Sequence, residues 1–431
     1  MNKYNSYKDS EVKWLDKIPD NWERSRIRMV GNLYGGLSGK KGDDFNREEN
    51  LSNKPFVPFT NIFNNTYISK DHFQYVNVEE GENQNRVLKN DLFFLMSSES
   101  YEDLGKSSIL LDDVEELYLN SFCKGFRIKD DRVYPLFLNY QLLGSLHKEM
   151  ISLEGNGFTR INLRQDRLLD IPVFIPPLEE QQQIVSFLDD KTQKIDSLIQ
   201  QKEKKIKLLK EKRTSLINHV VTKGLDTNVV MKDSGVEWIG EIPNHWGCFK
   251  MKYGVNHISE KSQPNKIDIR ISPENVESNT GVCFNLYSEH ESEGMRFISG
   301  DVLLNKLRLY LKKILFTEYD GYSLGEMIVL RTNESLVNKY FYHILFNQGL
   351  IDLLDSQSTG VKLPRVSPDI IMNSEIIYPP LSEQQQIVEY LDEQTQLIDN
   401  TISIEEKRIE LLKEYRQSAI SEVVTGKRKV D

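Results

Sequence analysis

Side chains that read nucleic-acid bases and side chains that neutralise phosphate occur together in one short stretch, NKLRLYLKK, which follows a Gly-Asp turn and a predicted strand. Asn and Arg make paired hydrogen bonds with adenine and guanine edges, whereas Lys contacts phosphate. The stretch is therefore a candidate nucleic-acid contact, and a solvated basic loop is the alternative. The candidate residues are Asn305, Lys306, Arg308, Tyr310, Lys312 and Lys313.

The corresponding stretch nearer the N-terminus, MSSESYEDLGKSS, is more acidic. Glu99, Glu102 and Asp103 oppose contact with phosphate, but a carboxylate can accept a hydrogen bond from cytosine N4. This stretch is a second candidate contact on that ground. Its candidate residues are Ser97, Ser98, Lys106 and Ser107.

Three glycine-containing stretches supply the remaining candidates. GGLSGKKGDDF is a basic loop whose backbone could approach phosphate, which is a weak signal by itself. GNGFTRINL and STGVKLPRVS occupy similar places in the two halves of the chain, and each reads equally as a structural turn or as a contact. The residues concerned are Lys40, Lys41, Arg160, Lys362 and Arg365.

Motifs for catalysis are missing from the sequence. IPPL and YPPL share the prolines of an adenine-methylase motif but lack its polar and aromatic residues, and no GxxxxGK[ST] phosphate loop occurs. Seven scattered His residues form no triad or metal spacing, and the three cysteines lie far apart. We expect a chain without catalytic residues, bound metal or cofactor.

Composition is that of a globular protein. Hydrophobic residues make up 39% of the chain and charged residues 28%, and the net charge is −10. That charge argues against a generally basic nucleic-acid coat but permits a local basic patch. No apolar run is long enough to span a membrane, and the first residues do not resemble a secretory signal. We expect a cytoplasmic protein that does not bind membranes.

Two internal repeats define the elements that must position these candidates. PPLEEQQQIVSFLDDKTQKID from Pro176 and PPLSEQQQIVEYLDEQTQLID from Pro379 are identical at 15 of 21 positions. KDSEVKWLDKIPDNW from Lys8 and KDSGVEWIGEIPNHW from Lys232 are identical at 8 of 15. The chain is therefore two tandem units, each a leader, a variable stretch and a repeated segment.

The variable stretches predict divergent copies of one small α/β domain. NDLFFLMSS from Asn90 aligns with GDVLLNKLR from Gly300, and SFCKGFRIK from Ser121 with SLGEMIVLR from Ser323. LNYQLLGSL from Leu138 aligns with YFYHILFNQ from Tyr340. Short apolar runs between Gly-Asp and Asn-rich turns indicate strands, followed by a helix near the end of each domain. The tryptophans of the two leaders are expected to anchor the domains against the helices; they are Trp14, Trp22, Trp238 and Trp246.

The repeated segments predict two long helices. Each runs some 44 residues without Gly or Pro, which corresponds to a rod of roughly 65 Å. Apolar residues recur every seven positions, and the interruptions coincide, as in Thr192 with Thr395 and Arg213 with Arg416. We therefore expect an antiparallel coiled coil related by a pseudo-two-fold axis, because a parallel pair would crowd both domains at one end. The N-terminal leader is expected near the end of the second helix.

These features together give an α/β (α+β) fold with two globular domains and two long helices. The predicted division is 1–177 for the first domain with its leader, 178–224 for the first helix, 225–378 for the second domain, and 379–431 for the second helix and tail.

The two motifs, each occurring twice around divergent domains, resemble the specificity subunit of type I restriction-modification systems over essentially the whole chain. The resemblance implies that each domain is a target recognition domain reading one half of a bipartite double-stranded DNA sequence. It also implies that the helices set the gap and dock two methyltransferase subunits, with restriction/motor subunits in the full complex. S-adenosylmethionine would then belong to the methyltransferase, and ATP and Mg to the restriction partner.

The same resemblance suggests where the partners dock. Identical polar residues at the two helix starts would offer equivalent surfaces to two identical subunits. They are Glu180, Gln181, Gln182, Gln183, Glu383, Gln384, Gln385 and Gln386. The alternatives are a two-headed coiled-coil scaffold that ignores DNA and, from the class of enzymes, a fused specificity–methyltransferase or nuclease.

Overall fold

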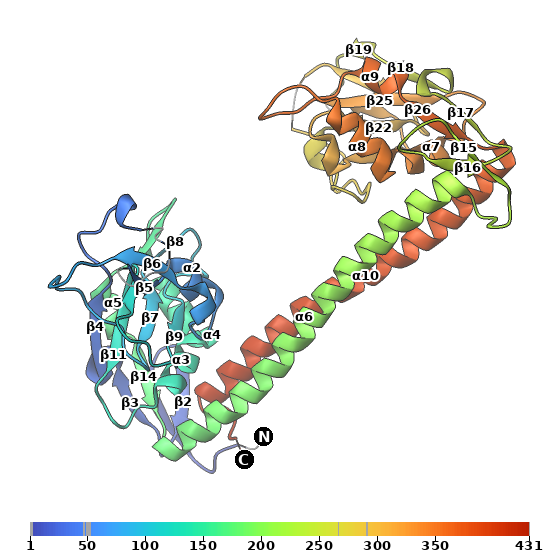
Figure 1. The fold of residues 1–431 in the computed structure, drawn as a ribbon. Helices are drawn as coiled ribbons and strands as arrows, with labels where there is room; N and C mark the ends of the chain where they lie inside the picture. The colour runs from blue at the N-terminus through green and yellow to red at the C-terminus, as the bar shows by residue number, and fades with distance from the viewer. Residues whose placement is uncertain (1–2, 46–47, 49–52, 266, 290–291, 431) are drawn as a thin grey trace. The chain divides into compact units, whose positions relative to one another are not determined.

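The computed structural model describes residues 3–45, 48, 53–265, 267–289 and 292–430. It divides into unit 1, Met1–Gln201 with Arg408–Asp431, and unit 2, Lys202–Lys407. Each unit consists of a mixed α/β head and a section of the long helices α6 (Leu178–Lys223) and α10 (Leu381–Val424) (Figure 1). The predicted fold class is confirmed. The four-segment division of the chain stays a prediction.

The head of unit 1 combines short strands with short helices. Its strands are β1 (Tyr7–Val12), β2 (Leu15–Pro19), β3 (Glu23–Arg26), β4 (Gly31–Gly35), β5 (Asn53–Val57), β6 (Gln74–Asn77), β7 (Leu92–Leu95), β8 (Ser97–Ser98), β9 (Ser107–Ile109), β10 (Tyr118–Leu119), β11 (Cys123–Ile128), β12 (Gly155–Asn156), β13 (Ile161–Leu163) and β14 (Pro172–Ile175). Its helices are α1 (Ile27–Val30), α2 (Phe59–Asn64), α3 (Pro135–Leu143), α4 (Ser145–Leu153) and α5 (Gln165–Asp170).

The head of unit 2 has a similar composition. Its strands are β15 (Met231–Asp233), β16 (Glu241–Pro243), β17 (Gly247–Lys250), β18 (Val255–Ile258), β19 (Lys261–Ser262), β20 (Arg270–Ile271), β21 (Gly294–Phe297), β22 (Val302–Asn305), β23 (Ile314–Phe316), β24 (Gly321–Ser323), β25 (Met327–Thr332) and β26 (Glu375–Tyr378). Its helices are α7 (Asn338–Leu345), α8 (Gln348–Ser356) and α9 (Pro368–Asn373).

The central sheet has the same order in both heads. Unit 1 has β4-β11-β7-β9 and unit 2 has β18-β25-β22-β23, with every neighbouring pair antiparallel. The pairs β3-β14 and β17-β26, and the leader hairpins β1-β2 and β15-β16, also correspond. The other sheets differ: β10-β5-β6 and β12-β13-β8 in unit 1, against β19-β21-β24-β20 in unit 2. The heads are therefore divergent copies of one fold, as predicted.

Two of the aligned registers were wrong by a small shift. Arg127 of β11 and Arg331 of β25 make the same contact, so the strands correspond at an offset of 204 residues and not 202. The backbone amides of Tyr134 and Val337 receive the same glutamine contact, which aligns α3 with α7 at an offset of 203. Apolar spacing alone did not fix the strand register, because a shift of two residues leaves each side chain on the same face of the strand.

A buried carboxylate joins the central strands of each sheet. Asp91, 2% exposed at the start of β7, accepts two hydrogen bonds from Arg127 at 2.7 and 2.9 Å. Asp301 of unit 2, 1% exposed, accepts two from Arg331, both at 2.7 Å. Such bidentate pairs are strong and fix geometry, so each pair fixes the strand from which the predicted contact loops emerge.

The long helices pack antiparallel in each unit, as predicted. In unit 1 the start of α6 shares a core with the end of α10, and Asp196 pairs with Arg416 at 2.9 Å. In unit 2 the end of α6 shares a core with the start of α10, and Arg213 pairs with Asp399 at 3.0 Å. The arginines that interrupt the apolar rows therefore bind acids on the opposite helix. Figure 1 shows the two helices side by side in each unit.

The leader tryptophans anchor the heads in three of the four cases. Trp238 is partly buried and packs against the core that the unit 2 head shares with α6 and α10. Trp22 and Trp246 are buried, and their indole N–H groups donate to Glu180 and Glu383, each at 2.9 Å. Trp22 also shares a core with Val423 and Val424, so the leader packs near the end of α10, as expected. The prediction was wrong for Trp14, which is 47% exposed. Within the described part of the chain, the helices contain no apolar stretch of the length needed to span a bilayer.

Candidate nucleic-acid interface

In unit 2, two of the predicted stretches form a single surface. The chain leaves β22 at Lys306, and a second loop crosses it near Arg365. The Arg308 amide donates to the Pro364 carbonyl at 2.9 Å, and the Val366 amide donates to the Lys306 carbonyl at 3.1 Å. Long-range backbone pairing therefore brings together residues that are about 60 positions apart in the sequence.

A carboxylate that the sequence did not single out holds two of these cations. Glu326 pairs with Lys306 at 3.4 Å and with Arg365 at 2.8 Å. Arg308 and Lys362 are exposed, and the Arg308 guanidinium lies 3.4 Å from the Lys362 carbonyl. The surface therefore carries four cations against one anion, with the half-exposed ring of Tyr310 on the same loop. We call this set of residues the unit 2 loop surface.

Three residues of the same stretch point inward. Asn305 is buried, and its side chain both donates to and accepts from the backbone of Leu307, so it shapes the turn. The Lys312 ammonium donates to the Phe346 carbonyl at 3.0 Å, and burial lowers the Lys312 pKa to about 8. Lys313 donates to the Pro273 carbonyl at 2.7 Å. We leave these three out of the loop surface.

In unit 1, the corresponding stretches also meet. Strand β8 pairs antiparallel with β13, and the Arg160 Nε donates to the Ser97 hydroxyl at 2.7 Å. Ser98 is buried beside them and accepts from the Ser100 amide. The residues border a hollow of about 640 Å³. We call this the unit 1 loop surface.

The unit 1 hollow is more aromatic and more acidic than its counterpart. Phe122 is largely exposed, with the Arg160 guanidinium 5.8 Å from its ring centre. Phe59 and Phe63 line the same hollow, as do Glu99 and Asp103. The exposed Phe122 ring offers a face on which a base could stack, whereas Phe59 and Phe63 are half-buried. Nothing in the sequence pattern had marked these residues out.

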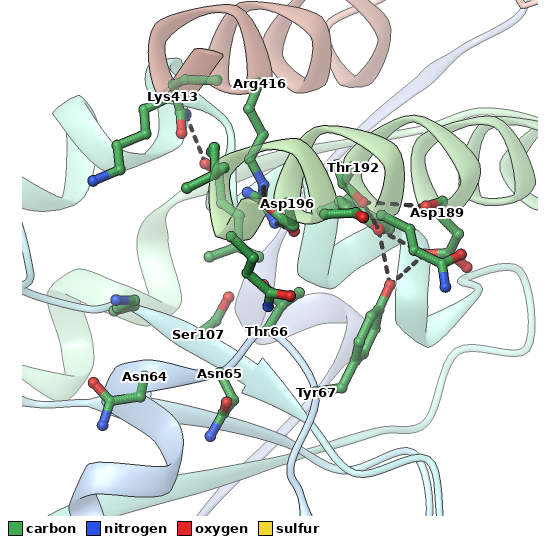
Figure 2. A pocket seen from close by; sticks show the side chains of 18 of the residues that line it. Asn64, Asn65, Thr66, Tyr67, Ser107, Asp189, Thr192, Asp196, Lys413 and Arg416 are labelled. Carbon is green, nitrogen blue, oxygen red and sulfur yellow. Dashed lines mark hydrogen bonds and ion pairs between the residues drawn. The ribbon is translucent and has the colours of Figure 1, made fainter. Parts of the chain in front are cut away.

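The other two candidates from this stretch face a larger groove between the unit 1 head and the long helices, about 1170 Å³ in volume (Figure 2). The Lys106 ammonium lies 4.7 Å from the Phe63 ring centre, and burial lowers its pKa, an effect that the charge of Arg416 increases. Ser107 is buried and its hydroxyl donates to the Asn139 side chain at 2.8 Å. Lys148, Lys413 and Arg416 also line this groove, which makes it rich in cations.

An aspartate on each long helix fixes the head to the helices. In unit 1 the hydroxyls of Tyr67 and Tyr140 donate to Asp189 (Figure 2). In unit 2, the equivalent Asp392 binds Lys339 at 2.8 Å and His343 at 3.0 Å. The position is the same in both repeats, but the groups that hold it differ.

The two lysines of the predicted glycine-rich basic loop differ in exposure. The Lys40 ammonium is paired with Glu82, which leaves little of it exposed, whereas Lys41 is exposed and its backbone amide donates to Asp44 at 2.8 Å. Among the residues that the structure describes, no hydrogen bond or ion pair joins either lysine to the unit 1 loop surface.

At each helix start, one of the three predicted docking glutamines is buried and the other two are exposed. Gln181 is buried, and its amide joins the Tyr134 amide and the Arg132 and Pro176 carbonyls. Gln384 does the same in unit 2. Glu180 and Glu383 are held by the tryptophans of their own unit. The exposed members are Gln182, Gln183, Gln385 and Gln386.

Helix α10 carries a second apolar row that faces away from its coiled-coil seam. Tyr390, Leu397 and Ile404 of unit 2 are exposed at intervals of seven residues. The equivalent positions of α6 are Phe187, Lys194 and Gln201, so the row is not part of the shared repeat. An exposed apolar row of this period is suited to packing against another helix.

Comparisons with known proteins identify the family. The sequence matches the family described as "Type I restriction modification DNA specificity domain" over residues 19–208 and 300–414. The type I restriction enzyme MjaVIII specificity subunit of Methanocaldococcus jannaschii is 25% identical, over 98% of this chain and 97% of that protein. The EcoDI specificity subunit of Escherichia coli is 22% identical, over 64% of this chain and 66% of that protein.

Solved structures show the same fold. A chain from a structure of complex assembly and conformational transition in a type I R-M system superposes with a TM-score of 0.70 at 14% identity, covering 96% of this chain and all of that one. The HsdS subunit of Thermoanaerobacter tengcongensis gives a TM-score of 0.53 at 15% identity, covering 96% and 98%. With the repeated heads, the paired helices and the family match over most of its length, the chain belongs to the type I restriction-modification DNA specificity family.

Proposed function

We propose that this DNA-recognising, non-catalytic chain reads a bipartite target, one half with each head. The observation that carries the proposal is that the same two loops pair in both heads, beside central sheets of the same order. The pairing brings Ser97 next to Arg160 in unit 1, and Lys306 next to Arg365 in unit 2. The frames match while the loops differ in charge and in aromatic content. Different side chains on one frame favour two different base sequences.

The paired helices are proposed to set the unspecified gap and to dock two methyltransferase subunits. The exposed glutamines of the two helix starts are equivalent by repeat, which suits two copies of one partner. The exposed row of Tyr390, Leu397 and Ile404 offers an apolar surface for a partner helix. In such a complex the methyltransferase would bind S-adenosylmethionine and modify adenine, and the restriction/motor subunits would bind ATP and Mg.

Base-resolution mapping of adenine methylation tests the reading of DNA. Cells carrying this gene with its neighbouring genes are compared with cells lacking it. We expect a methylated motif of two short halves with a fixed gap. Replacing the loops of one head by those of a related subunit should change one half only. An unchanged methylation pattern, with all of these genes expressed, would favour the two-headed scaffold.

Substitution in the α10 row tests the docking surface. Leu397→Asp places a charge in the apolar row. Because the row occurs on α10 only, we expect one of the two methyltransferase subunits to be lost from the purified complex. Lys194→Asp on α6 is the matched control, since it is the equivalent repeat position without an apolar side chain. Equal loss in both variants would show that the row itself is not the dock.

A further inference from the structure

Each head has a loop whose tip carries a fully exposed hydrophobic side chain. Phe158 follows β12 in unit 1 and is fully exposed, at 101%. Val361 occupies the corresponding loop of unit 2 and is exposed at 102%. These side chains add nothing to either core, although most large apolar groups in the protein are at least partly buried.

The two positions are equivalent in the repeat. Phe158 and Val361 are 203 residues apart, which is also the separation of the long-helix repeats that begin at Pro176 and Pro379. Each follows a glycine with positive φ, Gly157 at 137° and Gly360 at 100°. The same backbone feature therefore presents an apolar side chain at the same place in both heads, even though the surrounding sequences differ.

The loops are held in place by their bases. In unit 1, the hairpin β12-β13 is extended by β8, and the Tyr101 hydroxyl donates to the Gly157 carbonyl at 3.2 Å. A Cβ added at Gly157 would lie 2.1 Å from the Arg160 carbonyl oxygen, so glycine is required there. In unit 2, Thr359 and Arg365 close the loop with two backbone hydrogen bonds, at 2.8 and 2.9 Å. Each tip is thus supported by a defined base.

The charged residues next to the two loop tips favour DNA over protein as the binding partner. Arg160 lies two residues beyond Phe158, and Lys362 directly follows Val361. Both cations belong to the loop surfaces described above, and both are exposed. Proteins that insert hydrophobic side chains between base pairs have this arrangement: the apolar side chain contacts the bases, and neighbouring cations contact phosphate.

We propose that Phe158 enters the DNA of its half-site and partly unstacks one base step, and that Val361 makes the equivalent apolar contact with bases in the other half. The proposal rests on the reading of bipartite DNA proposed above. The Phe158 ring has a face on which a base can stack, whereas the smaller Val361 side chain contacts base edges such as the thymine methyl group. Half-site recognition would then depend on how easily the sequence deforms, as well as on base-edge hydrogen bonds.

The test uses the complex of this chain with its methyltransferase subunits and duplexes carrying the mapped target. 2-Aminopurine replaces in turn each adenine of the first half other than the methylated one, which the methyltransferase itself would turn out of the stack. Its fluorescence rises when it is unstacked. We expect a rise at one step with the wild type and none with Phe158→Ala, whose dissociation constant should rise roughly 5- to 150-fold. The salt dependence of binding should stay the same, because no phosphate contact is lost. Phe158→Trp should restore the fluorescence.

Controls separate this idea from its alternatives. Met29→Ala removes another largely exposed apolar side chain of unit 1 and should change neither signal. Unchanged fluorescence and affinity in Phe158→Ala would overturn the proposal while leaving bipartite reading intact. Loss of subunit assembly in Phe158→Ala, measured by sedimentation, would instead place the residue in a protein interface and also overturn it. A wild-type complex without a bipartite target would overturn the proposed function and this inference together.

Discussion

Replacing Glu326 by glutamine should tighten the binding of DNA by the unit 2 loop surface. The Glu326 carboxylate lies 3.4 Å from the Lys306 ammonium and 2.8 Å from the Arg365 guanidinium. These two ion pairs must therefore be broken before DNA phosphate can bind the two cations. Glutamine keeps the size and the hydrogen-bonding capacity of the side chain but removes the charge. The backbone hydrogen bond from Lys306 to the Glu326 carbonyl is unaffected.

The size of the effect follows from the exposure of the pairs. The side chains of Glu326, Lys306 and Arg365 are 26, 29 and 51% exposed, so each pair contributes about 0.2–1 kcal/mol. Loss of both should lower the dissociation constant roughly 2- to 30-fold at low salt. The gain should shrink as the salt concentration rises, because screening weakens exposed charge interactions.

The assay is a titration of the assembled complex with a duplex carrying the mapped target, repeated over a range of salt concentrations. Glu334→Gln is the matched control, because it removes the same charge from an exposed position of unit 2 outside the loop surface. Weaker binding by Glu326→Gln, with Glu334→Gln unchanged, would refute the reasoning. In that case Glu326 would be holding the cations in a reading position or accepting a hydrogen bond from a base.

Two further predictions concern stability. Arg331→Met leaves the buried Asp301 carboxylate without its cation and should lower the free energy of unfolding in urea by about 3–5 kcal/mol. Arg296→Met breaks an exposed 3.9 Å pair and should lower it by under about 1 kcal/mol. Similar losses in the two variants would contradict the buried-pair argument. Burial lowers the His147 pKa from 6.5 to about 4, so the folded state takes up a proton less readily than the unfolded chain. The free energy of unfolding should therefore fall as pH drops from about 6.5 to about 4, by at most about 1.4 kcal/mol per pH unit, and His147→Gln should flatten this slope in pH-dependent urea titrations; an equally steep slope in both proteins would contradict the assignment.

The repeated frame of the protein could be predicted because its signals are local. A seven-residue period placed Leu188 and Leu391 in the helix seam, and both are fully buried. The order of the segments favoured an antiparallel pair, which the Asp196–Arg416 contact confirms. The leader repeat likewise predicted the buried anchors Trp22 and Trp246. Periodicity and chain order survive in a single sequence because they need no knowledge of distant partners.

The composition of the loop surfaces could be predicted only in part. The sequence picked out Ser97, Arg160, Lys306 and Arg365 as separate possibilities, and the pairing of strands and loops far apart in the chain brought them into two clusters. It missed Glu326, because nothing in its own neighbourhood marks a residue that lies on another strand end.

The sequence by itself determined the two-unit architecture, the long helices and their relative direction, and the family resemblance. Only the tertiary structure decided which polar side chains face water. Lys312 and Gln181 have the residue types of contact residues but satisfy backbone groups inside their own unit. Phe158 is of a type that normally packs in a core, yet it stands at an exposed loop tip. The physical reason is that exposure depends on which remote segments supply hydrogen-bond partners and apolar contacts, and a residue's type and local spacing do not contain that information.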